Sequence, residues 1–376
     1  MSTESTPVPE TKEKTSFQIV RRGQLAAGHV FDWDDPENLA PLNPQKYQTW
    51  LTNPLADNDE DPVQIIGLLG RRVIGKIDLL AGRCQIDGRE TPILWTSELY
   101  VPEQFRKTMM GVSLILKMQT LGKYFGACGI SIMATPLFAK LKWLNIPMRR
   151  HIALRRSRSV VTQKLGAGFL GIMASFFVDI GLRLYWLMLA MKISLSTMAL
   201  DCKPLDLNDA STAAKLDAAF QQSAGKRKFH RSSKWVQWVL NNDLSDNPRN
   251  KRVAFGIYGN NGELDGYFLI RDRFYPVATH RQFKNLTLGS LSDWAIFDST
   301  TVTLKQVVLL ALRELARRKV DAMEICIAEH EAKPNLKWWG LVPVGELQLM
   351  LKTPTSANET AADWTVRPAD GDNGFG

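Results

Sequence analysis

Apolar and polar residues alternate in short runs over most of the chain, and turn-forming residues lie between these runs. In the first half this pattern predicts strands at residues 17–22, 63–69, 73–80, 92–101, 130–133 and 148–154. Apolar residues at helical spacing predict helices at 46–51, 106–123 and 136–143. Strands and helices in this mixed order indicate an α+β or α/β layered fold, with a mixed central sheet flanked by helices.

The same order of elements is predicted again in the second half. Strands are expected at 198–206, 253–258, 263–271, 286–297, 320–328 and 346–352, and helices at 209–223, 232–240, 303–319 and, as a short turn or helix, 334–339. Asn260-Asn261-Gly262 predicts a hairpin turn. We therefore expect two domains of similar architecture, at 17–157 and 197–353. The polar ends, 1–16 and 354–376, are predicted to be disordered tails.

The most apolar stretch of the chain, 165–195, lies in the predicted linker region 158–196 between the two halves. Asp179 and Arg183 interrupt it, and a charge at the centre of a bilayer costs about 2.5–3.5 kcal/mol. One interpretation is a linker helix packed between the two domains. The alternative is a helix that lies in a membrane interface, flanked by Lys164 and Lys192. The sequence leaves both open.

The charge of the chain narrows the classes of partner. Lys and Arg number 47 against 38 Asp and Glu, so the net charge is +9, which favours polyanionic partners. The basic residues are spread and show no zinc-finger spacing, so nucleic acid is not an expected partner. The four cysteines are isolated and the histidines lack metal spacing, so neither a disulfide framework nor a metal site is expected. We expect a cytoplasmic protein, with membrane association through 165–195 left open.

One segment combines a strand end, a basic turn and a helix start. The strand predicted at 92–101 stops at Pro102, and the turn that follows contains Arg106 and Lys107. The N–H groups at a helix start are unpaired, and they carry the positive end of the helix dipole. Such a turn is suited to bind phosphate.

This segment resembles the phosphate-binding motif of the GNAT superfamily of acyl-CoA-dependent N-acyltransferases, Arg/Gln-x-x-Gly-x-Gly/Ala. Arg106 and Gly111 match the motif, while Met109 stands where its first glycine is expected. A methionine there narrows the approach of a ligand to the backbone. The second half resembles another copy of the same fold but lacks the motif. The whole chain thus resembles tandem GNAT proteins, with a degenerate second domain.

The resemblance implies an acyl-CoA co-substrate, such as acetyl-CoA, and an amine acceptor that attacks the thioester directly. Glu98 would be the catalytic base, and Tyr124 would protonate the leaving thiolate. The pantetheine arm would pair with the strand edge at residues 99–101, and the pyrophosphate would bind the turn at residues 106–111. The implied cofactor-binding residues are Leu99, Tyr100, Val101, Arg106, Lys107, Thr108, Met109, Met110 and Gly111.

The acceptor is expected to be a small molecule or a polysaccharide precursor that carries an amine, by analogy with tandem GNAT proteins of cell-envelope pathways. Asp293, Trp294 and Asp298 are candidates to line its cleft, and the basic run 226–231 is a candidate to contact a phosphate or an acidic acceptor. The alternative function is a non-catalytic or membrane-peripheral interaction protein with a degenerate GNAT fold. Met109 and the second half without a motif favour that alternative.

Overall fold

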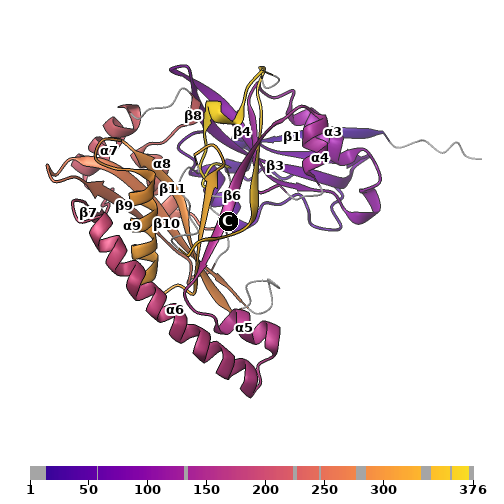
Figure 1. The fold of residues 1–376 in the computed structure, drawn as a ribbon. Helices are drawn as coiled ribbons and strands as arrows, with labels where there is room; N and C mark the ends of the chain where they lie inside the picture. The colour runs from indigo at the N-terminus through magenta and orange to yellow at the C-terminus, as the bar shows by residue number, and fades with distance from the viewer. Residues whose placement is uncertain are drawn as a thin grey trace, which may run out of the picture.

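The described residues of the first half form six strands with helices on both faces of the sheet (Figure 1). The structure is a computed structural model, and it describes residues 14–371 apart from 57, 131–133, 223–226, 245–246, 277–284, 332–339 and 356–357. The elements of this half are β1 (Thr15–Arg21), α1 (Arg22–Ala26), α2 (Pro44–Leu51), β2 (Pro62–Leu69), β3 (Arg72–Ile86), β4 (Arg89–Tyr100), η1 (Glu103–Phe105), α3 (Met110–Met118), β5 (Phe125–Cys128), α4 (Thr135–Lys140) and β6 (Leu144–Leu154).

Two helices follow, and the second half then repeats the order of elements. The remaining elements are α5 (Arg158–Leu165), α6 (Phe169–Ser196), β7 (Asp201–Pro204), α7 (Ala210–Gln222), β8 (Arg227–Phe229), α8 (Ser233–Asn241), β9 (Lys251–Tyr258), β10 (Leu264–Tyr275), β11 (Leu286–Ile296), α9 (Leu304–Arg317), β12 (Ala322–Ala328), β13 (Val342–Lys352), η3 (Ala361–Asp363) and β14 (Trp364–Thr365). The short helix or turn predicted at 334–339 lies outside the described residues.

One continuous sheet runs through both predicted domains, in the order β1-β2-β3-β4-β5-β13-β6-β12-β11-β10-β9-β7. The two halves exchange their last strands. β13 of the second half pairs with β5 and β6 of the first, and β6 pairs with β12 of the second. The parallel pair β4 with β5 in the first half corresponds to β11 with β12 in the second, and β14 also pairs parallel with β8. Because the last strands are exchanged, the sheet of neither half is complete without the other.

The two faces of the sheet carry different cores. A hydrophobic cluster shared by both halves lies under α2, α7 and α8, and it includes Trp50, Trp95 and Trp238. The indole N–H of Trp238 donates to the carbonyl of Thr49 at 3.1 Å and so links α8 to α2. On the opposite face, α3 and α4 cover the first half and α9 covers the second half. The mixed sheet flanked by helices confirms the predicted fold class.

Local signals fix several of these elements. Ser232 caps α8 by accepting from the N–H of Trp235, and Thr303 and Gln306 form a capping box at the start of α9. Asp209 accepts hydrogen bonds from Thr212 at the start of α7, as predicted. The turn before Gly262 joins β9 to β10. The observed positions of these caps and turns agree with the predictions, because a cap or a turn depends only on residues that are close in the sequence.

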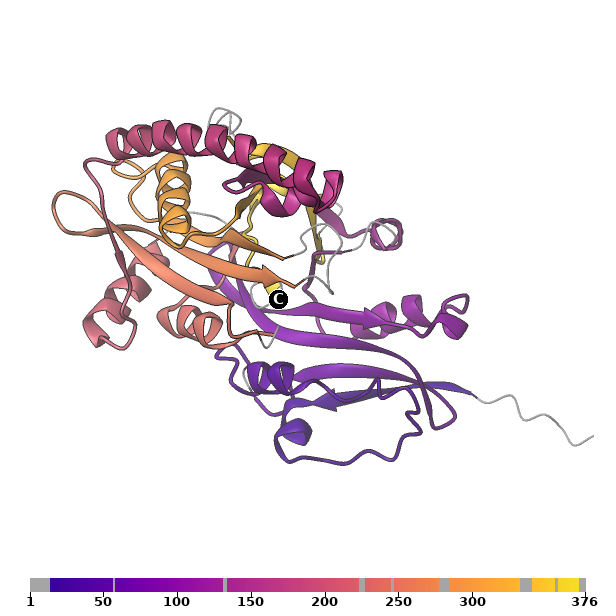
Figure 2. The same ribbon diagram turned by 90° about the horizontal axis from the view of Figure 1, so that it is seen from below.

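Two expectations, one about the C-terminal tail and one about the linker helix, are wrong. Most of the predicted loose tail 354–376 is packed into the molecule: Trp364 is 1% exposed and stacks on Phe229, with 5.6 Å between the ring centroids. The predicted tail 1–16 lies largely outside the described residues, although 15 and 16 belong to β1. The apolar linker helix α6 is not packed between the two halves. It lies along the outer side of the second half, as both views show (Figures 1 and 2).

Candidate active site

The predicted phosphate-binding turn lies at the surface, between the end of β4 and the start of α3. Arg106, Lys107 and Thr108 are exposed, and the side chain of Arg106 donates from Nε to the carbonyl of Val101 at 3.2 Å. This contact closes the turn. In the part of the chain that the structure describes, the N–H groups of Met109, Gly111 and Val112 have no hydrogen-bond partner. The turn therefore offers several amide donors to an anion.

Met109, which departs from the GNAT motif, lies at the surface of this turn. Its side chain is 68% exposed. Gly111 has open space beside it, since a Cβ there would meet only Val101, at 3.8 Å. Neither packing nor backbone conformation thus requires a glycine at position 111. The turn is accessible from solvent.

The strand that leads to this turn loses its neighbour before it ends. The parallel pairing of β4 with β5 covers Leu94 to Thr96, and β4 then continues to Tyr100. At Ser97 the register between β3 and β4 shifts, because Asp78 pairs with Glu98 while Leu79 pairs with Thr96. Such an extra residue is a β-bulge, and bulges are common beside active sites. Among the described residues, no strand pairs with β4 on the side of β5 at Glu98, Leu99 and Tyr100, so this last part of the edge is open.

Glu98 lies in a cluster of charges on the sheet rather than alone beside a substrate. Lys46 donates to Glu98 at 2.6 Å and to the fully buried Asp78 at 2.8 Å, and Lys76 lies 3.5 Å from both carboxylates. Gln64 donates to Asp78 at 2.8 Å. Burial works against the charge of Glu98, but the hydrogen bond and charge of Lys46, with the charge of Lys76, lower the pKa of Glu98 below its ordinary value. Glu98 is therefore a weak base in this state.

Tyr124 lies beside the middle of β4, away from the turn. Its carbonyl accepts from the N–H of Leu94, which begins the pairing of β4 with β5. Burial raises the pKa of Tyr124, and the charges of Cys84 and Glu359 raise it further. The structure thus groups Tyr124 with residues of the β3–β4 hairpin and the C-terminal segment. It does not bring Tyr124 together with Glu98 or Arg106.

A second set of polar residues surrounds a cavity of about 420 Å³. Asp293 and Trp294 line it, as predicted, whereas Asp298 does not; Lys228 and Arg231 from the basic run 226–231 also line it. The other polar lining residues are Gln85, Glu90, Gln221, His230, Glu331, Thr365 and Arg367. The cavity therefore draws on the β3–β4 hairpin, on the second half and on the C-terminal segment.

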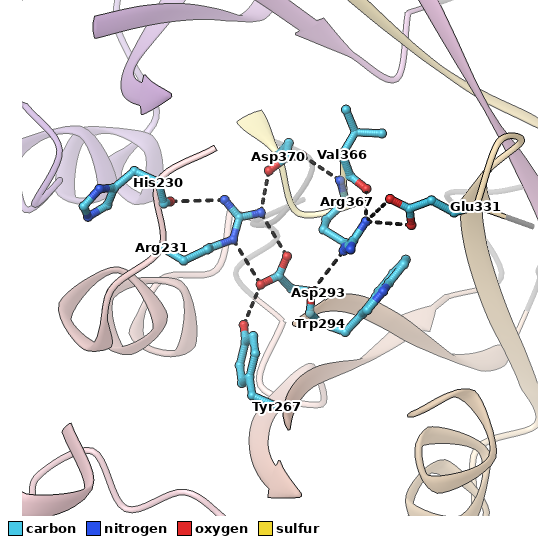
Figure 3. A network of polar contacts seen from close by, with 9 residues as sticks. All are labelled: His230, Arg231, Tyr267, Asp293, Trp294, Glu331, Val366, Arg367 and Asp370. Carbon is cyan, nitrogen blue, oxygen red and sulfur yellow. Dashed lines mark hydrogen bonds and ion pairs between the residues drawn. The ribbon is translucent and has the colours of Figure 1, made fainter. Parts of the chain in front are cut away.

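An ion-pair network holds the wall of this cavity (Figure 3). Arg231 donates to Asp293 at 2.9 and 3.1 Å and pairs with Asp370. Tyr267 donates to Asp293 at 2.6 Å. Beside it, Arg367 donates to both oxygens of Glu331 at 2.9 Å, and its guanidinium lies 4.2 Å from the ring centroid of Trp294. Arg231, Asp293 and Trp294 of this network are among the candidates singled out from the sequence. Arg367 and Asp370 were missed, and they lie in the stretch predicted to be a loose tail.

A smaller cavity connects this wall to the middle of β4. It has about 20 Å³, and its lining includes Trp95 together with Phe229, His230 and Arg231, which also line the larger cavity. The rings of Trp95 and Phe229 lie 4.8 Å apart, and His230 donates from its backbone N–H to the carbonyl of Arg83 at 2.9 Å. Burial lowers the pKa of His230, and Arg231 and Arg83 lower it further against the charge of Glu90. His230 is therefore a neutral imidazole at neutral pH.

No group of three or more His, Cys, Asp or Glu residues that could hold a metal ion occurs within the described ranges. The side chains at these two places can supply hydrogen bonds, charge and proton transfer. The turn can bind an anion, and the cavity can enclose a small polar molecule.

Comparisons of sequence give no match, since neither a protein-family profile nor a curated protein is similar enough to this chain. Comparisons of structure do. Saccharomyces cerevisiae N-myristoyltransferase with bound myristoyl-CoA aligns with a TM-score of 0.52 and 13% identity, over 93% of this chain and 85% of that one. A probable N-acyltransferase of unknown function from Enterococcus faecalis aligns with a TM-score of 0.51 and 10% identity, over 90% and 72%.

A GCN5-related N-acetyltransferase from Anabaena variabilis also aligns, with a TM-score of 0.50 and 10% identity, over 90% of this chain and 72% of that one. Identities this low indicate a similar backbone arrangement, but they do not show that site residues correspond. The alignments nevertheless span 93% and 90% of this chain, so they include residues of both halves. The chain therefore has a GNAT-like fold, as its resemblance at the turn after β4 predicts.

Proposed function

We propose that this protein is an N-acyltransferase that uses an acyl-CoA as its acyl donor. The observation that carries the proposal is the open edge of β4 over Glu98, Leu99 and Tyr100, next to the exposed turn before α3. A pantetheine arm could add to that edge as an extra strand, with its diphosphate at the amides of Met109, Gly111 and Val112. The yeast neighbour with bound myristoyl-CoA supports an acyl-CoA in general.

The reaction would be direct attack of an amine on the thioester carbonyl. The C–N bond forms, the C–S bond breaks, the amine loses a proton and the CoA thiolate gains one. We assign the removal of the amine proton to His230, because it is neutral and because the small cavity joins it to Trp95 in the middle of β4. Glu98, the base expected from the resemblance, is bound by two lysines and is the weaker candidate.

The acceptor would bind in the 420 Å³ cavity. This volume lies within the range of about 300–1,000 Å³ that is typical of small-molecule sites. Its lining combines cations such as Lys228 with carboxylates such as Glu90, so a polar acceptor with an amine fits better than an apolar one. A polysaccharide precursor remains one member of this class.

Isothermal titration calorimetry with acetyl-CoA and myristoyl-CoA tests the donor. We expect at least one of them to bind, and Arg106→Glu to weaken that binding at least tenfold, because a carboxylate replaces the cation beside the diphosphate. Lys123→Glu is the matched control, since it makes the same change of charge at an exposed position beyond the far end of α3. Binding that is absent with both ligands, or equally weakened by both variants, would refute the assignment of this turn.

A further inference from the structure

The helix α6 turns its apolar side chains outward. Six of them, at positions where a soluble helix normally carries polar residues, are between 56% and 65% exposed. We call this set the apolar stripe: Phe176, Phe177, Leu184, Leu187, Met188 and Met191. Exposed apolar surface of this extent marks an interaction site.

The opposite side of α6 is attached to the protein over much of its length. Asp179 accepts from the backbone N–H of Ser157 at 2.6 Å, and Trp186 donates to the carbonyl of Leu154 at 3.1 Å. Further along, Leu189 and Ile193 are buried in the core of the second half. These contacts hold α6 against the surface of the molecule (Figure 2).

This attachment decides between two ways of meeting a membrane. By length and hydropathy, α6 could cross a bilayer. A crossing needs about 20 residues within the hydrocarbon, and every one of them must be free of the polar protein body. Residues 179–193 are bound to that body, so a crossing would draw the second half into the lipid. A helix that lies in the plane of the membrane keeps these contacts and covers the apolar stripe.

The charges beside the stripe identify the kind of surface. On a helix with 3.6 residues per turn, Arg183 and Lys192 lie on opposite flanks of the stripe, each about 90° from its centre. Residues 155–198 contain six basic residues, Arg155, Arg156, Arg158, Lys164, Arg183 and Lys192, and one acidic residue, Asp179. The carboxylate of Asp179 is used inside the protein. The rim of the stripe is therefore cationic.

A second copy of the chain is a poor partner for this surface. A symmetric dimer places the same patch against itself, so Arg183 and Lys192 of both copies would meet with no acidic group on the patch to pair with them. Anionic lipid head groups supply the missing negative charge, and the acyl chains below them supply an apolar phase. We propose that α6 docks in the plane of an anionic membrane surface, with the apolar stripe in the acyl-chain region and Arg183 and Lys192 at the head groups.

The position of α6 leaves the other face of the molecule in solution. Figures 1 and 2 place α6 on a different side of the molecule from α3 and its exposed turn. A membrane-bound molecule would thus keep that turn open to soluble ligands. This inference does not depend on the proposed function, because it uses no residue of the turn or of the cavity.

Vesicle flotation of the full chain tests it. We expect the protein to float with vesicles made of equal parts phosphatidylcholine and phosphatidylglycerol, and less with phosphatidylcholine alone or at high salt. Leu184→Glu with Met188→Glu should reduce flotation at least tenfold, because both carboxylates would enter the acyl-chain region. Arg183→Gln with Lys192→Gln should remove the preference for the anionic vesicles. Circular dichroism confirms that each variant folds.

The matched control is Val30→Glu with Val342→Glu, which replaces two valines that are 89% and 59% exposed outside α6. It should float like the unchanged protein. Four results would overturn the proposal. One is no flotation with either vesicle, another is equal loss in the control, and the third is a membrane fraction that sodium carbonate cannot extract, which would show a spanning helix. A stripe that instead holds two copies together in sedimentation, without lipid binding, would also overturn it.

Discussion

Arg231 and Asp370, which are 139 residues apart in the sequence, form an ion pair beside the cavity. Arg231 is the shared partner of Asp370 and Asp293, and its guanidinium lies 4.0 Å from the ring centroid of Trp235. Two buried carboxylates thus share one cation, which leaves an excess of negative charge. Burial raises the pKa of Asp370 to about 6, and the charge of Asp293 contributes, against the opposing effect of Arg231.

Asp370→Asn should change how stability depends on pH. Between about pH 4 and pH 6 the folded protein keeps the Asp370 proton while the unfolded chain loses it, so the free energy of unfolding falls as pH rises through this window. Asparagine does not titrate. The free energy of unfolding of the variant, relative to that of the unchanged protein, should therefore rise by about 2–3 kcal/mol between pH 4 and pH 7. Urea denaturation at a series of pH values measures this, and parallel curves for the two proteins would contradict it.

The local elements of the fold follow from the sequence, but their exchange between halves does not. The hairpin turn at Asn260-Asn261-Gly262 and the cap at Thr303 depend on a few neighbouring residues. By contrast, β13 is predicted as a strand, and nothing in its own residues says that it pairs with β5 of the other half. Pairing over such a distance is decided by the whole sheet.

The strand β5 has no counterpart among the predicted strands, and its small residues have a packing reason. A strand is expected at 130–133, most of which lies outside the described residues, whereas β5 is found at Phe125–Cys128. Its sequence Phe-Gly-Ala-Cys contains no β-branched residue and so gives no strand signal. The small residues are needed because the ring of Trp95 lies over Gly126, where a Cβ would overlap it. Likewise, nothing in the sequence indicates that Lys46 pairs with Glu98, which lies 52 residues further along the chain.

Two glycines beside the site should respond in opposite ways to the same substitution. Gly126→Ala should destabilise the fold by about 1–3 kcal/mol, because the new methyl group overlaps Trp95. Gly111→Ala should leave stability unchanged or slightly higher, because the space beside it is open and alanine favours a helix. If a diphosphate binds there, Gly111→Ala should instead weaken acyl-CoA binding. Thermal unfolding and calorimetry separate the two effects, and a large loss of stability in Gly111→Ala would contradict the geometry.

Lys46 should be important for stability through Asp78. Lys46→Met leaves the fully buried Asp78 with Lys76 at 3.5 Å and Gln64 as its charged and polar partners. We expect a loss of about 2 kcal/mol, since a buried carboxylate that loses a close cation is costly. Asp78→Asn added to Lys46→Met should recover part of that loss, because it removes the uncompensated charge. Chemical denaturation of the two single variants and the double variant measures the coupling between Lys46 and Asp78. If the losses of Lys46→Met and Asp78→Asn simply add in the double variant, Lys46 does not act through Asp78.

His230→Gln separates the two candidate bases once an acceptor is known. As a general base His230 must be neutral. Its pKa is lowered from the ordinary value of 6.5, so the imidazole is neutral at neutral pH. The rate should therefore be constant at neutral pH and fall on the acid side as His230 takes up a proton. His230→Gln should reduce kcat by about 100-fold or more and remove that acid limb, while leaving acyl-CoA binding unchanged.

Glu98→Gln is the comparison, and its effect on kcat should be less than tenfold, because Glu98 is paired with Lys46 and Lys76. Steady-state kinetics over a pH series with both variants decides the matter. A larger loss in Glu98→Gln than in His230→Gln would return the role of base to Glu98. It would then mean that Lys46 moves away from Glu98 when the acyl donor binds, since a carboxylate bound by two lysines has too low a pKa to take the proton.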